Sequence, residues 1–199
     1  MTCRPCVWPT WLFAVLLALG SPARQVTAEE TETAADVAPG VDHTELAASV
    51  AEQYRKRVLF YRSEYPPGTI IVNTNERFLY FLLPNNLAIR YGVGVGRDGF
   101  QWAGAHRITR KAEWPDWTPP PEMIARQPYL PRWMAGGPGN PLGARALYIG
   151  TTVYRIHGTN APETIGQAVS SGCFRLVNDD VTDLYQRVPV GTLVIVNHR

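Results

Sequence analysis

Proline constrains the middle of this chain more than any other residue type does. Eight prolines lie between residues 102 and 141: Pro115, Pro119, Pro120, Pro121, Pro128, Pro131, Pro138 and Pro141. Each proline holds φ at about −65° and lacks an amide donor, so this density excludes long helices and strand ladders. Four tryptophans share the segment, namely Trp102, Trp114, Trp117 and Trp133. We therefore expect a stiff, lid-like insertion that either covers the core or forms a cleft wall presenting aromatic rings to a sugar or peptide.

Short runs of β-branched and aromatic residues on both sides of this insertion predict strands. Before it the runs cover residues 69–73, 77–83 and 87–95, and after it residues 147–150, 154–157 and 191–196. Only two helices are expected among them, a short one at residues 162–169 and another at residues 178–187. The fold class is therefore mostly β, a β-rich α+β fold with a few peripheral helices.

The N-terminal region predicts export. Arg4 precedes an apolar run at residues 11–19, and small residues follow at 26–28, which is typical of a cleaved signal peptide over residues 1–28. An uncleaved anchor helix is the alternative, although the run is shorter than the about 20 residues that span a bilayer. Residues 29–43 are acidic and lack bulky aromatic side chains, which predicts a flexible linker. Residues 44–65 are expected to form a helix over 44–57 and a connection.

Charge and cysteine content exclude several classes of function. Without Arg4 and Arg24, which leave with the signal peptide, 17 basic residues face 17 acidic ones, so nothing indicates a nucleic-acid partner. The signal peptide also contains Cys3 and Cys6, so Cys173 would be an unpaired thiol in an oxidising compartment. Such a thiol is reactive, pairs with a cysteine of another molecule, or is a buried apolar side chain. No second cysteine or paired-histidine spacing favours zinc, and we expect no metal and no cofactor.

The residues around Cys173 suit nucleophilic catalysis. A cysteine nucleophile needs a base, and His157 precedes it at the end of an expected strand, with fifteen residues between the two. The amides of Gly172 and Cys173 are candidate donors to an oxyanion, because glycine allows a substrate to approach the backbone closely. Arg175 would favour the thiolate or hold a carboxylate. His106 is a second, weaker candidate for the base.

Three glycines, Gly94, Gly96 and Gly99, match the spacing of a dinucleotide-binding turn. That mechanism needs a helix immediately afterwards, and the sequence that follows has no helical periodicity. We therefore interpret these glycines as tight turns and close backbone contacts.

Residues 156–196, IHGTNAPETIGQAVSSGCFRLVNDDVTDLYQRVPVGTLVIV, resemble the catalytic core of the L,D-transpeptidase (YkuD-type) family, whose pattern is HG, a spacer, and S-x-G-C followed by Arg or Asn two residues later. The resemblance implies a YkuD-like, β-sandwich-type catalytic domain over residues 66–199. It also implies Cys173 as nucleophile and His157 as base, with the Gly158 carbonyl orienting the imidazole and Gly172 and Cys173 forming the oxyanion hole. Many members carry histidine where Ser171 stands here.

We expect five residues to bind substrate: Arg175, Ser171, Tyr154, Thr159 and Asn160. The resemblance implies acyl transfer on peptidoglycan in the periplasm or cell envelope, with no membrane span once the signal is removed. Cys173 would attack the third residue of a tetrapeptide stem and expel D-Ala, and an amine would then resolve the thioester. A neighbouring stem as acceptor gives a 3→3 cross-link, an outer-membrane protein becomes attached to peptidoglycan, and water gives L,D-carboxypeptidase activity. The sequence does not choose among these acceptors, and a non-catalytic peptidoglycan-binding domain is the alternative class.

Overall fold

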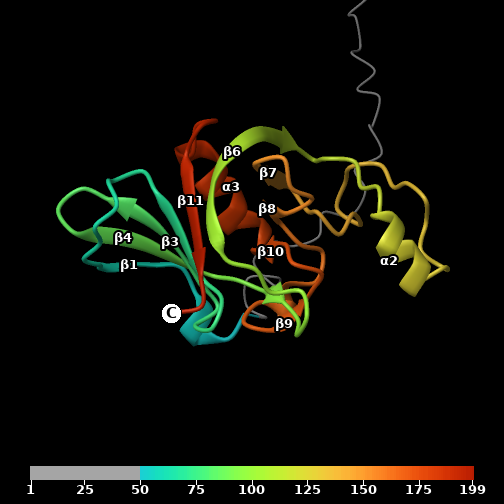
Figure 1. Ribbon diagram of the computed structural model, residues 1–199, viewed down its shortest axis with the longest axis horizontal. Coiled ribbons are helices and arrows are strands. Elements are labelled where there is room, and N and C mark those ends of the chain that lie inside the picture. The colour runs from blue at the N-terminus through green and yellow to red at the C-terminus, as the bar shows by residue number, and fades with distance from the viewer. Residues whose placement is uncertain (1–49) are drawn as a thin grey trace, which may run out of the picture. The chain divides into compact units, whose positions relative to one another are not determined.

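The computed structural model describes residues 50–199, and this part of the chain is mostly β, as the sequence predicts (Figure 1). The expected signal peptide, the linker and the first part of the expected N-terminal helix lie outside the described residues. Within residues 50–199, neither helix has the length and apolar character needed to cross a membrane.

Eleven strands, two helices and two 3₁₀ turns (η) make up this part of the chain. In chain order they are η1 (Glu52–Tyr54), β1 (Arg57–Phe60), β2 (Ile70–Asn73), β3 (Phe78–Leu83), β4 (Leu87–Gly92), β5 (Val95–Gly96), β6 (Gly104–Glu113), α2 (Pro121–Arg126), β7 (Arg145–Ile149), β8 (Arg155–His157), η2 (Pro162–Thr164), β9 (Ala168–Ser170), β10 (Phe174–Arg175), α3 (Asn178–Arg187) and β11 (Leu193–Asn197).

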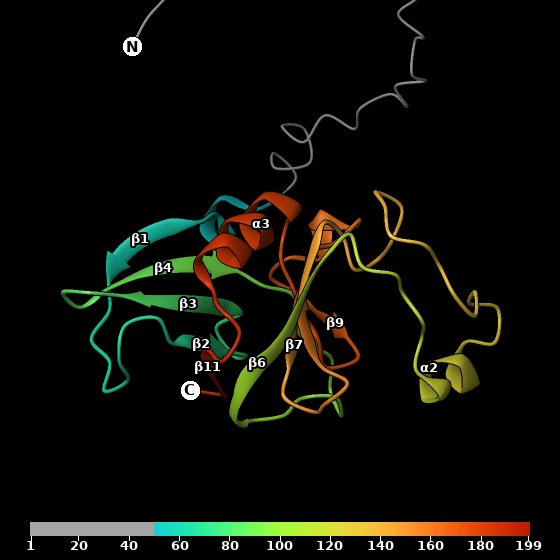
Figure 2. The same ribbon diagram turned by 90° about the horizontal axis from the view of Figure 1, so that it is seen from above.

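One long strand, β6, joins the two halves of the main sheet. The strand order is β1-β4-β3-β2-β11-β6-β7-β8-β10, and β5 and β9 form a separate pair. The first half of β6 pairs with β11 and the second half with β7, with an irregularity between Ile108 and Arg110. The sheet curls at this point, so its two halves face each other across the core (Figure 2).

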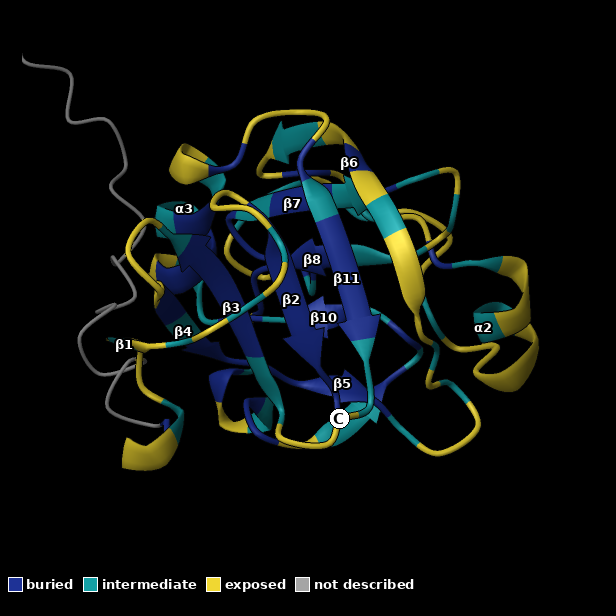
Figure 3. Cartoon of the chain, turned by 60° about the vertical axis from the view of Figure 1, so that its left-hand side comes forward, coloured by how far each residue is buried: buried dark blue, intermediate teal, exposed yellow. Residues whose placement is uncertain are grey.

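The core fills the space inside this curl, and α3 closes it on one side. Strands from both halves contribute fully buried side chains, among them Leu79 of β3 and Leu147 of β7, and α3 adds Val181 and Leu184. β2 is buried on both faces, because Ile71 packs into a second apolar cluster behind the sheet. This explains its uninterrupted apolar sequence, and Figure 3 shows β2 and β11 as buried strands at the centre.

The predicted helix at residues 178–187 is present as α3 with the same bounds, but two other helix predictions are wrong. Residues 50–57 contain only η1 before the chain enters β1. Residues 162–169 contain η2 and then the extended strand β9, which pairs with β5. Gly166 has φ +82° and lies against the Tyr54 ring, and this conformation ends any helix there.

Two strand predictions also need correction. Residues 102–141 were expected to exclude ladders, yet β6 is the longest strand of the described chain. The first proline of the segment is Pro115, so the residues before it are free to pair on both sides. The run expected at residues 87–95 is divided, because β4 ends at Gly92 and β5 begins at Val95 with a different partner.

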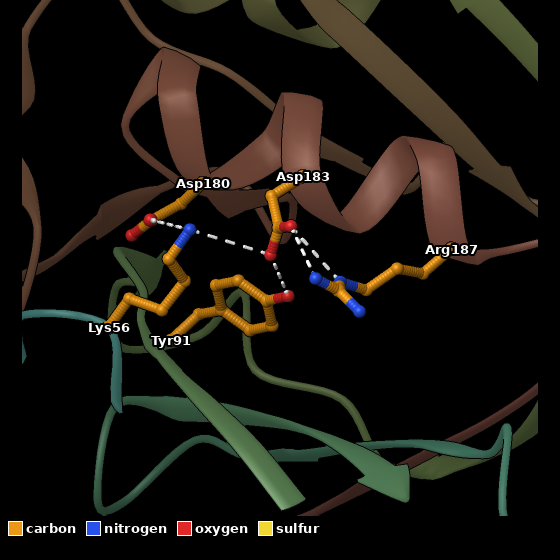
Figure 4. Close-up of polar contacts among 5 residues, drawn as sticks. All are labelled: Lys56, Tyr91, Asp180, Asp183 and Arg187. Carbon is orange, nitrogen blue, oxygen red and sulfur yellow. Dashed lines mark hydrogen bonds and ion pairs between the residues drawn. The ribbon is translucent and has the colours of Figure 1, made fainter. Parts of the chain in front are cut away.

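A cluster of charged residues attaches α3 to β4 and to the segment before β1 (Figure 4). The Tyr91 hydroxyl donates to Asp183 Oδ2 at 2.7 Å, and Arg187 donates to Asp183 Oδ1 at 3.0 and 2.8 Å. Lys56 Nζ lies 3.5 Å from Asp183 and 3.8 Å from Asp180. Burial raises the pKa of Asp180 to about 6. Burial also acts on Asp183, but the hydrogen bonds from Arg187 and Tyr91 and the charge of Lys56 hold the pKa of Asp183 below its ordinary value.

These opposite shifts predict opposite effects on stability. The folded pKa of Asp180 lies above its ordinary value, so its ionisation costs stability as pH rises from about 4 to about 6. The folded pKa of Asp183 is depressed, so its charge contributes stability that is lost as pH falls. At about pH 7 we expect Asp180→Asn to raise Tm by roughly 5 °C and Asp183→Asn to lower it. Both differences should shrink toward acid pH in thermal unfolding followed by circular dichroism. A change of the same sign in both variants would contradict these assignments.

Candidate active site

The parallel pair of β8 and β10 gathers four polar side chains on one face. Ile156 pairs with Phe174 and His157 with Arg175, and the two apolar members of these pairs are buried in the core. Because side chains alternate along a strand, the residues between them face the other way. All four of these residues line one cleft of about 280 Å³: Arg155, His157, Cys173 and Arg175.

The proline-rich insertion forms part of this cleft. Its contributions include Trp117, Pro120, Met123, Gln127 and Leu130, which lie in and around α2. The geometry therefore favours the cleft wall over a simple cover for the core. Two of the four tryptophans of the insertion, Trp114 and Trp133, are exposed and do not help to cover the core.

His157 is held as a neutral base. Its side chain is buried, and its Nδ1 lies 2.6 Å from the Gly158 carbonyl oxygen. A carbonyl only accepts, so Nδ1 carries the proton and Nε2 keeps a lone pair. Burial, together with the charges of Arg175 and Arg155, lowers the pKa of His157 to about 3. The imidazole is therefore uncharged at neutral pH and able to accept a proton.

Packing requires the glycine that follows this histidine. A Cβ on Gly158 would collide with Asn178 Oδ1 and lie 3.0 Å from the Ala144 nitrogen. Asn178, the first residue of α3, accepts a hydrogen bond from the Ala144 N–H at 2.9 Å. The start of α3 and the turn before β7 thus enclose the peptide whose carbonyl orients His157.

Cys173 is a free, partly exposed thiol immediately before β10. Its Sγ lies 3.9 Å from the Val153 carbonyl oxygen. Burial raises the pKa of the Cys173 thiol, and the nearby Arg155 and Arg175 oppose that rise. The thiol is therefore protonated at rest, in the same cleft as an uncharged histidine. Sequence reasoning missed Arg155, although its position two residues before His157 is the strand spacing that brings it to the same face.

The amide of Gly172 is used within the turn that carries the cysteine. Gly172 N–H donates to Ser170 Oγ at 3.1 Å, and Ser170 Oγ donates to the Cys173 carbonyl at 2.6 Å. The Cys173 N–H has no protein acceptor among the hydrogen bonds of the described residues. Of the two amides expected to form an oxyanion hole, this geometry favours that of Cys173.

Two aromatic residues, Trp102 and Tyr154, support the turn that carries Cys173. Trp102 Nε1–H donates to the Gly172 carbonyl at 2.8 Å, and the indole stacks on Tyr154 with centroids 4.7 Å apart. Gly172 has φ +105°, and a Cβ there would collide with the Tyr154 ring. Sequence reasoning noted Trp102 only as part of the insertion, because nothing local indicates its contact with residue 172.

The other expected residues lie at different distances from the cleft. Ser171 lines it, whereas Tyr154 packs under the turn. The buried Thr159 accepts from the Ala161 N–H at 3.0 Å, and the exposed Asn160 donates to the Gly139 carbonyl at 3.0 Å. Neither belongs to the cleft lining. These two polar side chains stabilise the loop after β8 instead.

His106 and the glycine pattern have structural explanations. His106 lies in β6, not in a turn, and packs edge-on against Trp102 outside the cleft lining. A Cβ on Gly96 would lie 2.5 Å from the Phe100 carbonyl oxygen and 3.2 Å from Gly172 Cα. The turn is followed by β6 and not by a helix, so the interpretation as close backbone contacts is confirmed.

Similarity to known proteins agrees with this geometry. A family model described as the L,D-transpeptidase catalytic domain (YkuD) matches residues 67–196. The probable L,D-transpeptidase ErfK/SrfK of Escherichia coli is 42% identical over 134 residues, which are 63% of this chain and 42% of that protein. The chain thus spans less than half the length of this relative.

Two solved structures are also similar. A crystal structure from Brucella melitensis, described as a probable carnitine operon oxidoreductase caia, is 43% identical, with a TM-score of 0.50 over 75% of this chain and 96% of that one. L,D-transpeptidase 3 from Mycobacterium tuberculosis has a TM-score of 0.52 over 66% of this chain and 61% of that one, at 15% identity. The second likeness shows a shared fold only.

Two glycines with similar φ angles allow the cost of backbone strain to be measured apart from the cost of a side-chain collision. Gly172 and Gly191 have φ of +105° and +95°, but a Cβ on Gly191 meets nothing within 4 Å. We expect Gly191→Ala to lower the free energy of unfolding by about 1–2 kcal/mol through backbone strain alone. Gly172→Ala should cost at least roughly twice as much, because Tyr154 must also move. Urea denaturation measures both, and equal losses would show that the Tyr154 ring yields without cost.

The arginine beside the thiol should affect its titration. We expect the rate of Cys173 alkylation by iodoacetamide to rise with a midpoint above the ordinary cysteine value. Arg155→Gln removes a neighbouring positive charge, so the midpoint should move further up and alkylation at about pH 8 should slow by roughly three- to tenfold. Arg110→Gln is the control, since Arg110 contacts the same Tyr148 ring as Arg155 but lies outside the cleft lining. Equal slowing in both variants would refute the local effect.

Proposed function

This chain belongs to the L,D-transpeptidase family, and on that premise we propose that it is a peptidoglycan L,D-transpeptidase with Cys173 as its nucleophile. The observation that carries the proposal is the β8–β10 pair, in which a partly exposed thiol and a buried, neutral imidazole share one face and one cleft. Neither group is charged at rest, so the thiol proton passes to the imidazole only as the thiol attacks.

The first half of the reaction forms a thioester. His157 Nε2 accepts the thiol proton while Cys173 Sγ attacks the carbonyl carbon of the third stem residue. The oxyanion of the tetrahedral intermediate accepts a hydrogen bond from the Cys173 N–H, which has no acceptor within the described chain. The intermediate collapses with cleavage of the peptide bond, and the imidazolium returns its proton to the departing D-Ala amine.

The second half transfers the acyl group. An amine enters the cleft, His157 accepts its proton, and the amine attacks the thioester carbonyl. Collapse of this intermediate breaks the C–S bond and forms a new amide, and the imidazolium returns its proton to the departing Cys173 thiolate. With the amine of a neighbouring stem the product is a 3→3 cross-link, which is the outcome we propose. An outer-membrane protein as acceptor, or water, would use the same steps.

Catalysis by Cys173 does not require the histidine that many members carry before the glycine. Ser171 occupies that position and lines the cleft, while Arg155 supplies positive charge next to the thiol. We also propose that the N-terminal signal sends the protein to the periplasm, where peptidoglycan is available as substrate.

Two other functions have less support. The oxidoreductase description of one similar structure would need a cofactor site, and the glycine turn at residues 94–99 leads into β6 and offers no helix N-terminus to a pyrophosphate. A binding module without catalysis would have no use for a base held in one tautomer beside a free thiol.

Substitution of the two central residues tests the mechanism. With a disaccharide-tetrapeptide substrate, we expect wild type to form a thioester adduct in intact-mass spectra and to release D-Ala, and Cys173→Ala to do neither. His157→Ala should lower the acylation rate by about 10²- to 10⁴-fold, with partial recovery at higher pH, where hydroxide supplies thiolate. His106→Ala is the matched control and should remain close to wild type. Release of D-Ala by Cys173→Ala would refute the proposed mechanism.

A further inference from the structure

The cleft lining carries positive charge and includes no acidic side chain, although the charge of Glu163, outside the lining, acts on Arg175. Three arginines line it, Arg97 after β5, Arg155 of β8 and Arg175 of β10, and no aspartate or glutamate belongs to the lining. Within residues 50–199, none of these guanidinium groups donates a hydrogen bond to an oxygen or forms an ion pair, and Arg155 Nε is buried without a partner. Guanidinium groups elsewhere do find acceptors: Arg77, Arg107, Arg145 and Arg187. The free donors of the cleft suit an anionic ligand.

Backbone contacts hold Arg97 next to the cysteine turn. Its N–H donates to the Ser170 carbonyl at 3.0 Å, and the preceding Gly96 is the register partner of Ser170. The β5 segment also pairs with β10, because Gly94 and Arg175 exchange two backbone hydrogen bonds of 2.9 Å. Arg97 therefore belongs to the same rigid frame as Cys173, although it lies 76 residues earlier in the chain.

The Arg97 side chain is positioned by an aromatic ring and not by an acid. Its guanidinium carbon lies 4.4 Å from the centroid of Phe100, and that of Arg126 in α2 lies 4.8 Å from the same centroid. Stacking of this kind fixes the plane of a guanidinium while leaving its N–H groups free for a ligand. Only Arg97 of this pair lines the cleft.

Resting on the proposed function, we infer that Arg97 determines specificity by binding a second carboxylate of the donor stem. The terminal D-Ala carboxylate lies one residue from the scissile bond. Arg155 and Arg175, which flank the thiol, are therefore placed to bind this carboxylate. Arg97, on a separate element, binds a carboxylate farther along the stem. Such a stem offers two, the side-chain carboxylate of the third residue and the α-carboxylate of D-glutamate. The cleft is thus selective for stems in which one of these is free and not amidated.

Three tetrapeptide stems with diaminopimelate as the third residue test this inference: one with all carboxylates free, one amidated on the diaminopimelate side chain, and one amidated on the D-glutamate α-carboxylate. The measurement is kcat and KM for D-Ala release by wild type, Arg97→Gln and Arg126→Gln. We expect wild type to disfavour one of the amidated stems by at least about tenfold in kcat/KM. That stem identifies which carboxylate Arg97 binds.

The variants show whether Arg97 is responsible. Arg97→Gln should lose about tenfold on the free stem, mainly through KM, and should lose nothing on the disfavoured stem, because the pairing is already absent there. Arg126→Gln should keep the preference of wild type. Equal losses on all three stems, or no discrimination by wild type, would overturn the inference while leaving the proposed function intact. Absence of D-Ala release from every stem would overturn both.

Discussion

The parallel pairing of β10 with β8 is the contact on which the rest of the site depends. Only four residues take part in its register, yet it decides which side chains enter the core and which enter the cleft. A slip of one residue in β10 would turn Phe174 toward the cleft and Cys173 toward the apolar core, while the side chains of β8 kept their places. The large buried side chains of Ile156 and Phe174 therefore specify the position of the reactive residues as much as those residues do themselves.

Glycines and a few fixed polar contacts convert this pairing into a geometry for chemistry. Gly96 and Gly172 lack side chains, so the backbones of their two turns can pack directly against each other. Ser170 Oγ bridges the Gly172 N–H and the Cys173 carbonyl within the cysteine turn. Trp102 then holds that turn from the far side through a single hydrogen bond. Each of these residues restricts the backbone conformation of the turn that carries Cys173. The close packing of the two turns is possible only because small residues stand where they meet.

The sequence predicts the parts of this arrangement that depend on local patterns. Runs of β-branched and aromatic residues indicate the strands, and α3 has the predicted bounds, although its N-cap is Val177 and no side chain caps it. The short separation of His157 and Cys173 along the chain likewise favours a fold in which the two side chains meet. Prediction failed where distant segments decide the outcome: the expected helix at residues 162–169 is replaced by η2 and by the start of β9, because β5 is available to pair with β9. Arg97 and Trp102 could not be recognised for the same reason, since their partners lie far along the chain.

The hydrogen bond from His157 to the Gly158 carbonyl has a genetic consequence. Where a side chain orients a catalytic histidine, one codon change can delete the orienting group. A peptide carbonyl is present whatever residue is encoded, so the orienting group itself is beyond the reach of point mutation. The vulnerability moves to the glycine codon, because any larger residue at position 158 meets Asn178. Substitutions at position 158 are therefore expected to be rare, although glycine has no side chain that could take part in the chemistry.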